Sequence, residues 1–407
     1  MKPLQFHPKG LCAVVLLALS ALSVGCGGGS SKQNGTAPLA SSGGNVQPIV
    51  VNAGPAGNYA NGVFTSVTLC VPSSSSCQTI SGILVDTGSY GLRILSSAGG
   101  GALTLSLPQQ TASNGNPMGE CALFVSGFTW GSVNTADVII AGEQAGNVPV
   151  QVIDPTFAAV PSACKNTGVP ENDTLQTLGA NGILGVGPFA EDCGGACTQS
   201  GTSNPGMYYT CASTSCQITA EPLARQVQNP VVLFPNDNNG VIIQLPAVSG
   251  PAPSLAGSMV FGIGTQPNNT LGKAEVFPVN SSGEFNTTFK GQSYPAFVDS
   301  GSNAFFFLDS DITGIPACGS NGGFYCPTTT QKLSAITSSG NPSQTITFSI
   351  ANADSLFANR GDFVFDTLGG PNAGTFDWGL PFFFGRNVFT AIESRNTPAG
   401  AGPFWAY

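Results

Sequence analysis

The sequence contains few charged residues and almost no histidine. Charged residues make up 8% of the 407 positions, and the formal net charge is -9. A protein that binds nucleic acid needs a basic face, so this class of partner is excluded. The only histidine in the sequence, His7, lies in an N-terminal segment that we expect to be removed. The mature chain would then have neither a Ser-His nor a Cys-His catalytic pair, and no histidine-based metal site.

The apolar run near the N-terminus is too short for a membrane-spanning helix. It extends over Leu11–Val24 and follows Lys2 and Lys9, which is the pattern of a signal peptide. The segment Leu22–Cys26 is similar to a bacterial lipobox, and a plain secretory signal is the alternative. We therefore predict a signal peptide over residues 1–25.

The lipobox-like segment also predicts how the protein is held in the cell envelope. Cys26 is the expected site of lipidation, and the Gly/Ser-rich residues 26–47 are expected to form a tether without structure of its own. Gly27, rather than Asp, follows the cysteine, which in a Gram-negative host fits the outer membrane. We expect an exported protein with a lipid anchor in the bacterial outer membrane, facing the periplasm or the surface.

Glycine, proline and small polar residues are plentiful. The chain has 54 Gly and 30 Pro, and 41% of its residues are hydrophobic. This composition favours an all-β, turn-rich exported protein over a helical cytosolic one. The length is sufficient for two domains of ordinary size.

Ten cysteines remain once the N-terminal segment is set aside together with Cys12 and Cys26. An even number in an oxidising compartment predicts disulfides, and a zinc cluster of thiolates is the alternative. Proximity in sequence suggests five pairs: Cys70 with Cys77, Cys121 with Cys164, Cys193 with Cys197, Cys211 with Cys216, and Cys318 with Cys326. We expect no metal and no cofactor.

Two aspartates stand at the ends of apolar runs. Asp86 follows Ile83–Val85 and precedes Thr-Gly-Ser, and Asp299 follows Ala296–Val298 and precedes Ser-Gly-Ser. A buried carboxylate without a partner is costly, although either segment alone could be an ordinary Asx-turn. The second motif lies 213 positions after the first, which indicates internal duplication. We predict one β lobe over residues 48–235 and a second over residues 236–407.

Each aspartate motif is followed, about a hundred residues later, by an apolar segment that contains glycine. These segments are Asn181–Gly187 and Leu380–Arg386. With them, the sequence resembles the pepsin-like aspartic peptidases, whose lobes each carry Asp-Thr/Ser-Gly and a later hydrophobic-hydrophobic-Gly element. The resemblance extends from about Asn61 to Glu393. It includes an opening hairpin, a second-lobe strand and closing strands, over 61–85, 257–262 and 384–393 respectively.

The resemblance implies a bilobal fold with a cleft between the lobes and a catalytic pair, Asp86 and Asp299. Two neighbouring carboxyls share one proton, so one activates water while the other donates to the substrate carbonyl. The implied supporting residues are Thr87, Gly88, Ser89, Ser300, Gly301 and Ser302. The implied partner is a peptide or protein substrate, and we expect a monomer.

The chain departs from the family at two places. Arg93 stands where members usually have Trp, and the stretch that corresponds to the flap hairpin has no Tyr. Phe124, Phe128 and Trp130 are the candidates for covering substrate, and none supplies a phenolic hydroxyl. We therefore expect a slow or narrowly specific enzyme.

Other notable residues are interpreted structurally. Arg93, Asp137 and Trp130 are expected on the surface or in packing, and 305–307 and 382–384 as buried strands. The acidic residues Glu171, Asp173, Glu191 and Asp192 are interpreted as loop charges, with a calcium site as the alternative.

Three classes of function remain open. The first is a membrane-tethered aspartic endopeptidase. The second is a pepsin-like module with weak or no catalysis that binds a peptide or a partner in the same cleft. The third is a disulfide-stapled adhesin or structural β protein, in which the two Asp loops are turns.

Overall fold

The computed structural model describes residue 40, residues 42–212 and residues 215–407. The predicted signal peptide and the lipidation site Cys26 lie outside these residues. The described chain is built mainly from strands, which confirms the all-β prediction. No helix in this part of the chain is long and apolar enough to cross a membrane.

The largest sheet has fifteen strands. In spatial order they are β10 (Cys216–Ile218), β9 (Tyr208–Cys211), β5 (Met118–Phe124), β6 (Gly127–Ile140), β7 (Glu143–Ile153), β4 (Tyr90–Leu95), β8 (Gly182–Val186), β3 (Cys77–Asp86), β2 (Gly62–Cys70), β1 (Val46–Asn52), β12 (Leu255–Phe261), β11 (Gly240–Leu245), β21 (Arg386–Ala391), β24 (Phe404–Ala406) and β13 (Val276–Pro278).

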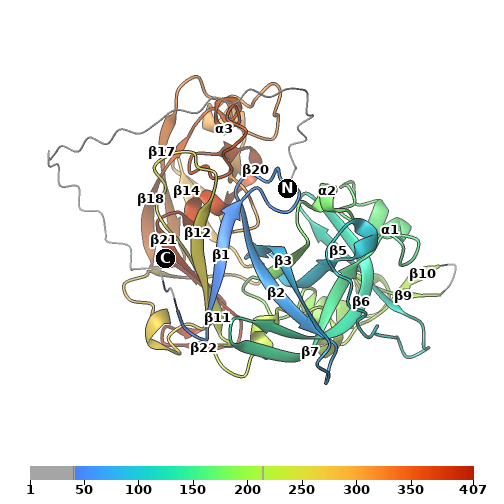
Figure 1. Ribbon diagram of the computed structural model, residues 1–407. Coiled ribbons are helices and arrows are strands. Elements are labelled where there is room, and N and C mark those ends of the chain that lie inside the picture. The colour runs from blue at the N-terminus through green and yellow to red at the C-terminus, as the bar shows by residue number, and fades with distance from the viewer. Residues whose placement is uncertain (1–39, 41, 213–214) are drawn as a thin grey trace, which may run out of the picture.

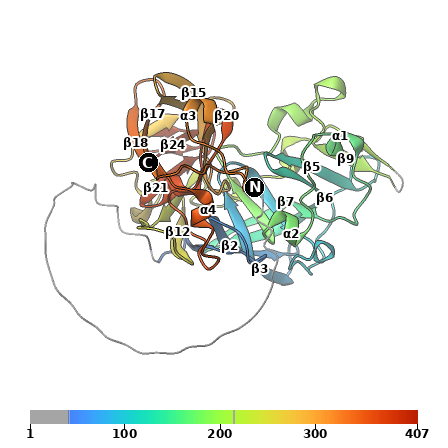
Figure 2. The same ribbon diagram turned by 90° about the horizontal axis from the view of Figure 1, so that it is seen from above.

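A second sheet has seven strands, all from the C-terminal part of the chain. In spatial order they are β18 (Ser343–Ile350), β17 (Gln331–Ser338), β14 (Phe285–Phe289), β15 (Gln292–Val298), β20 (Asn372–Trp378), β16 (Phe305–Leu308) and β19 (Gly369–Gly370). Seen from above, strands of this sheet and strands β5–β7 of the first sheet form two bodies on opposite sides of the molecule (Figure 2).

Short elements connect the strands. They are a hairpin of β22 (Asn396–Thr397) and β23 (Gly400–Ala401), the α-helices α1 (Ser162–Lys165), α2 (Leu175–Leu178), α3 (Ser310–Thr313) and α4 (Ala353–Leu356), and the 3-10 helices η1 (Ser97–Gly99), η2 (Gly194–Thr198), η3 (Gly201–Ser203), η4 (Leu223–Arg225), η5 (Pro230–Leu233), η6 (Pro267–Asn269) and η7 (Leu380–Phe383). Their shortness leaves the core to the sheets.

The sequence pattern explains the burial of individual strands. In β18 the apolar residues alternate with polar ones, so Ile346, Phe348 and Ile350 point to one face and are buried there. The end of β3 is apolar at consecutive positions. Ile83 and Val85 pack into one core cluster and Leu84 into another, so both faces of the strand are buried. The second run leads directly to Asp86.

The larger sheet joins the two halves of the chain (Figure 1). Strand β1 pairs with β12, where Val46 lies opposite Val260, and it also pairs with β2. The expected division at residues 235 and 236 therefore does not coincide with a boundary between sheets. The predicted tether, residues 26–47, ends too late in the chain. Strand β1 begins at Val46, and the buried Asn45 side chain donates to the Phe261 carbonyl at 2.9 Å.

All five disulfides suggested by sequence proximity are present. The prediction of disulfides is confirmed, and the alternative of a zinc cluster of thiolates is wrong. Among the described residues, one group with metal-ligand spacing consists of Cys318, Cys326 and Asp354, but its two cysteines are bonded to each other. The bridges indicate folding outside the cytoplasm.

The two phenylalanine runs have different structures. Phe305–Phe307 lies in β16, as expected, whereas Phe382 and Phe383 end the 3-10 helix η7 and Phe384 caps it. The strand prediction for the second run is wrong because Pro381, in the first turn of η7, favours a helical start and cannot donate to a sheet. Both runs are largely buried.

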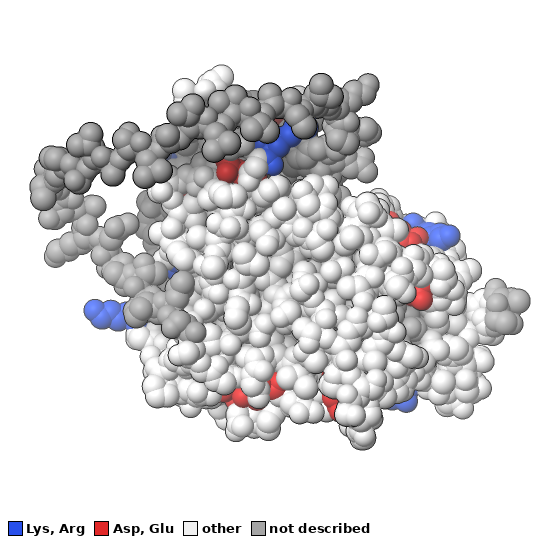
Figure 3. Space-filling model, in the orientation of Figure 1, with Lys and Arg blue, Asp and Glu red and all other residues white. Residues whose placement is uncertain are grey.

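Few charged side chains are visible on the face drawn in Figure 3.

Candidate active site

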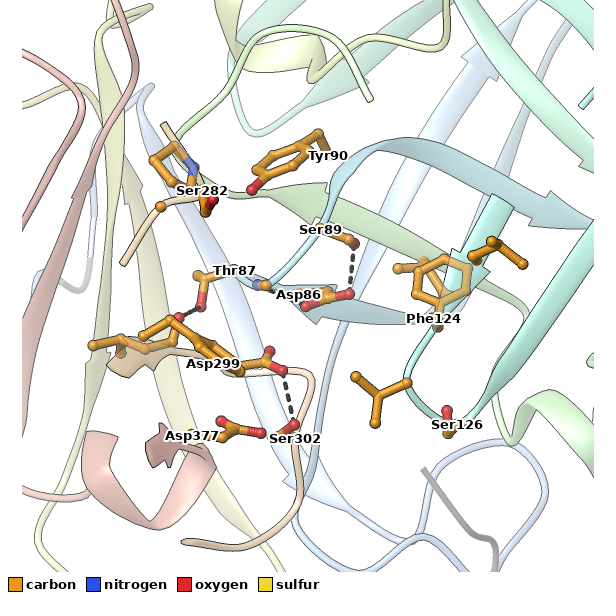
Figure 4. Close-up of a pocket in the computed structure, with 18 of the residues that line it drawn as sticks. Asp86, Thr87, Ser89, Tyr90, Phe124, Ser126, Ser282, Asp299, Ser302 and Asp377 are labelled. Carbon is orange, nitrogen blue, oxygen red and sulfur yellow. Dashed lines mark hydrogen bonds between the residues drawn. The ribbon is translucent and has the colours of Figure 1, made fainter. Parts of the chain in front are cut away.

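The two aspartate loops occupy equivalent positions in two parallel strand pairs. Strand β3 ends at Asp86, which pairs in register with Gly185 of β8. Strand β15 ends at Val298, directly before Asp299, and pairs with Trp378 of β20. Each aspartate therefore lies at the end of a strand whose neighbour runs in the same direction. Figure 4 shows that the two carboxyl groups lie side by side.

Hydrogen bonds between the two loops hold them together. The Thr87 hydroxyl donates to the Val298 carbonyl at 3.1 Å and accepts from the Ser300 amide at 2.9 Å. The Ser300 hydroxyl donates to the Val85 carbonyl at 2.8 Å and accepts from the Thr87 amide at 3.1 Å. Both side chains are fully buried. This reciprocal set of four bonds fixes the relative position of the two aspartates.

Each carboxylate has its own donors within its loop. Asp86 accepts from the Gly88 amide at 2.8 Å and from the Ser89 hydroxyl at 2.5 Å. Asp299 accepts from the Gly301 amide at 2.7 Å and from the Ser302 hydroxyl at 2.7 Å. The hydrogen bonds expected from the two serines are therefore present.

The two glycines allow the loops to approach. A Cβ on Gly88 would lie 2.6 Å from Cγ of Asp299, and a Cβ on Gly301 would lie 2.7 Å from Cγ of Asp86. Real side chains do not reach such distances, so any other residue would push the aspartates apart. The glycines are needed here because of close approach.

Burial and charge change the acidity of the pair. Burial, and next the charge of Asp299, raise the pKa of Asp86 well above its usual value. Such a pair holds one proton over a wide pH range. One member is then available as an acid while the other is a base.

A cavity of about 300 Å³ opens above the pair. Its walls come from both Asp loops, from the tip of the β5–β6 hairpin and from the 282–284 segment. Among the three flap candidates, Phe124 lines this cavity next to the exposed tip residue Val125. Phe128 and Trp130 are instead buried in a separate cluster, so they do not cover the cavity. Alternation along β6 aims both residues at that cluster.

The register identifies the glycine element of each half. Strand β8 brings Ile183-Leu184-Gly185 beside the first loop, within the segment expected. In the second half, the matching residues are Asp377-Trp378-Gly379, because Val298 pairs with Trp378. The prediction of Leu380–Arg386 for this element is wrong by several positions. This element was not recognised in the sequence because Asp377 stands where an apolar residue was expected.

Arg93 is part of a buried charge cluster. Its side chain is 2% exposed and forms ion pairs with Glu120 at 2.6 Å and Asp192 at 2.7 Å. Asp192 also accepts from the Tyr208 hydroxyl at 2.6 Å. Burial, and next the charge of Glu120, raise the pKa of Asp192. Of the two expectations for Arg93, packing is correct. Asp192 lies in a loop, as expected, but its side chain is 3% exposed and ion-paired.

Three residues near the pair were not recognised in the sequence. Asp377 lines the cavity, and burial and the charge of Asp299 raise its pKa. Tyr90 also lines the cavity, and burial and Asp86 raise the pKa of both Tyr90 and Tyr59. Tyr90 directly follows the motif, so a phenol adjacent to Asp-Thr-Gly-Ser was the available signal.

Comparison with solved structures supports the fold. An aspartic proteinase from Irpex lacteus matches with a TM-score of 0.51 and 15% sequence identity, over 89% of this chain and 96% of that chain. At this identity the likeness establishes the bilobal fold alone. No curated protein matches the sequence. A family model described as "Protein of unknown function (DUF3443)" matches residues 41–407, nearly the whole described chain. The chain therefore belongs to this family.

Proposed function

We propose that the protein is an exported aspartic endopeptidase that hydrolyses peptide bonds with Asp86 and Asp299. The observation that supports this most directly is the close approach of the Asp86 and Asp299 carboxyl groups at the base of a cavity (Figure 4). An ordinary Asx-turn would need only the Gly88 and Gly301 amide bonds, and would not need the two loops to face each other.

The proposed reaction uses the shared proton. The ionised member of the pair takes a proton from a water molecule, whose oxygen attacks the carbonyl carbon of the substrate. The protonated member donates its proton to the carbonyl oxygen, which gives a neutral tetrahedral diol. Collapse of the diol breaks the C–N bond: the ionised member of the pair takes a proton from a diol hydroxyl, and the protonated member gives its proton to the leaving amine. The pair ends with one proton, as it began, and no covalent intermediate with the enzyme forms.

The hydrogen bonds in the loops would prepare the pair for this reaction. Ser89 and Ser302 donate to the outer oxygens of the two carboxylates, which orients the inner oxygens toward each other and the cavity. The Thr87–Ser300 bonds keep this spacing when substrate enters. Preorganised groups of this kind lower the cost of reorganisation during reaction.

A catalytically weak binding module is the second candidate. The observation that favours it is the flap tip, where Phe124 offers no hydroxyl to the cavity. In either case we propose that the protein is a monomer of two lobes and that a lipid on Cys26 anchors it to the membrane. Its partner would be a peptide or protein.

The test is cleavage of a peptide mixture by the purified soluble part, with and without a pepstatin-type inhibitor. Asp86→Asn and Asp299→Asn should each lower cleavage by about two to four orders of magnitude, because Asn cannot exchange the proton. The exposed Asp311→Asn is the matched control and should retain activity. Cleavage that persists in both site variants refutes the proposal, whereas peptide binding without any cleavage supports the binding module.

A further inference from the structure

A third carboxylate lies beside the aspartate pair. Asp377 of β20 pairs with Phe297 of β15, two positions before Asp299. In the first half, Ile183 of β8 pairs with Leu84, two positions before Asp86. Asp377 and Ile183 are therefore equivalent positions, and both line the cavity. The second half has a carboxylate where the first half has an aliphatic side chain.

The Asp377 carboxylate is buried and incompletely satisfied. Its residue is 6% exposed, and its Oδ1 atom has no hydrogen-bond partner. The carboxylate lies close to Ser302, whose hydroxyl already donates to Asp299 (Figure 4). A buried carboxylate oxygen without a donor is costly and rare, so the position calls for a ligand that supplies one.

The charges around the cavity determine what kind of ligand fits. Among the residues that the structure describes, four carboxyl residues line it, namely Asp86, Asp299, Asp377 and Glu284, and no lysine or arginine does. Arg93, the buried arginine beneath the flap residue Phe124, is already engaged by two carboxylates. A cationic group that enters the cavity would therefore meet no competing positive charge from its walls.

We propose that Asp377 binds the cationic side chain of a lysine or arginine next to the scissile bond, and so selects basic residues there. This inference rests on the proposed function, because it assigns a substrate preference to the same cavity. Asp377 lies one strand away from Asp299, so its ligand belongs to a residue that flanks the bond under attack. Lysine and arginine supply several donors on long stems, which suits a recessed carboxylate.

Asp377 would act on binding rather than on the chemical step. In the absence of ligand, burial and the charge of Asp299 keep its pKa raised, so that it tends to hold a proton. An arriving ammonium or guanidinium group would favour the ionised form and displace that proton to solvent. Substrates with uncharged side chains would leave the oxygen without a donor, as in the empty site.

The experiment compares peptides that differ only by lysine or norleucine at one of the two residues of the scissile bond. Norleucine keeps the unbranched stem and removes the ammonium group. The kcat/KM values are measured for both, and Kd values are measured by calorimetry for the matching reduced-amide peptides, which cannot be cleaved. The wild-type protein should prefer lysine by at least about tenfold, the effect of one charge-assisted hydrogen bond.

Two variants test whether the preference for lysine depends on Asp377. Asp377→Ile installs the residue of the equivalent position Ile183 and should reverse the preference in favour of norleucine. Asp377→Asn keeps the shape and should abolish most of the preference. Both variants should unfold at the same or a higher temperature than wild type, because an unpaired buried carboxylate is removed. The exposed Asp311→Asn serves as the control and should keep the wild-type preference.

The outcomes separate this inference from the proposed function. Cleavage of both peptides with equal kcat/KM overturns the inference and leaves the peptidase intact. An equal loss for both peptides in Asp377→Asn also overturns it, since Asp377 would then act on the aspartate pair. Selective binding of the lysine peptide that depends on Asp377, without cleavage, supports the inference and refutes the peptidase.

Discussion

Replacing Thr87 with Val tests whether the two aspartate loops depend on each other. Valine has nearly the same shape as threonine but lacks the hydroxyl. The change removes the bond to the Val298 carbonyl at 3.1 Å and the bond from the Ser300 amide at 2.9 Å. Thr87 is 0% exposed, so water cannot replace either bond without a structural change.

The expected size of the effect follows from these two bonds. Each buried backbone group that loses its partner costs about 1–3 kcal/mol, so Thr87→Val should lower the free energy of unfolding by about 2–6 kcal/mol. Thr87→Ser is the matched control, since it keeps the hydroxyl and loses one methyl group, at a cost of about 1 kcal/mol. The difference between the variants therefore isolates the hydroxyl.

The measurement is equilibrium unfolding in guanidinium chloride with the disulfides kept oxidised. Peptide cleavage is measured in parallel under native conditions, where Thr87→Val should lose activity because the two carboxyl groups are less firmly positioned. Equal losses of unfolding free energy in the two variants would show that the bonds between the loops do not stabilise the fold. The assigned role of Thr87 would then be wrong.

Three further outcomes are expected. The pKa values of Asp86 and Asp377 are raised in the folded state, so the folded protein binds more protons than the unfolded one. Thermal unfolding at pH 4 should thus occur at a higher temperature than at pH 7.5. A Tm that is higher at pH 7.5 than at pH 4 would contradict this prediction. Cys26→Ser should move the protein from the membrane to the soluble fraction on ultracentrifugation, whereas unchanged sedimentation would exclude the anchor. Replacing Cys121 and Cys164 by Ala opens a loop with a sequence separation of 43 and should cost about 4 kcal/mol in chemical unfolding; no loss would refute its contribution.

The features that could be predicted from the sequence are those with local signals. Asp86 and Asp299 each follow an apolar run and precede a small-residue turn, and the glycines of that turn are needed for close approach. The five disulfides link cysteines close in sequence, so proximity was sufficient to pair them. The predicted hairpin over residues 61–85 is present as β2 and β3.

The features that were missed depend on contacts between distant residues. Arg93 is polar in sequence, but Glu120 and Asp192 satisfy its charge in the core, and only the fold brings the three together. Asp377 was overlooked because apolar residues were expected at its position, which is where the sequence departs from the pattern of the first half. Such departures concentrate at functional sites, where local preferences give way to other requirements.

The strand order of the larger sheet has a consequence for when the protein can fold. Strand β1 is made early, but its partner β12 begins at Leu255, and β13 requires β24 near the end of the chain. Pairings so distant in sequence form slowly, because closure of long loops must come first. If the chain is exported N-terminus first, as the proposed signal peptide implies, its N-terminal residues are delivered long before their partners. The nascent chain would therefore emerge with one edge of β1 unpaired, and an open edge invites aggregation until β12 arrives.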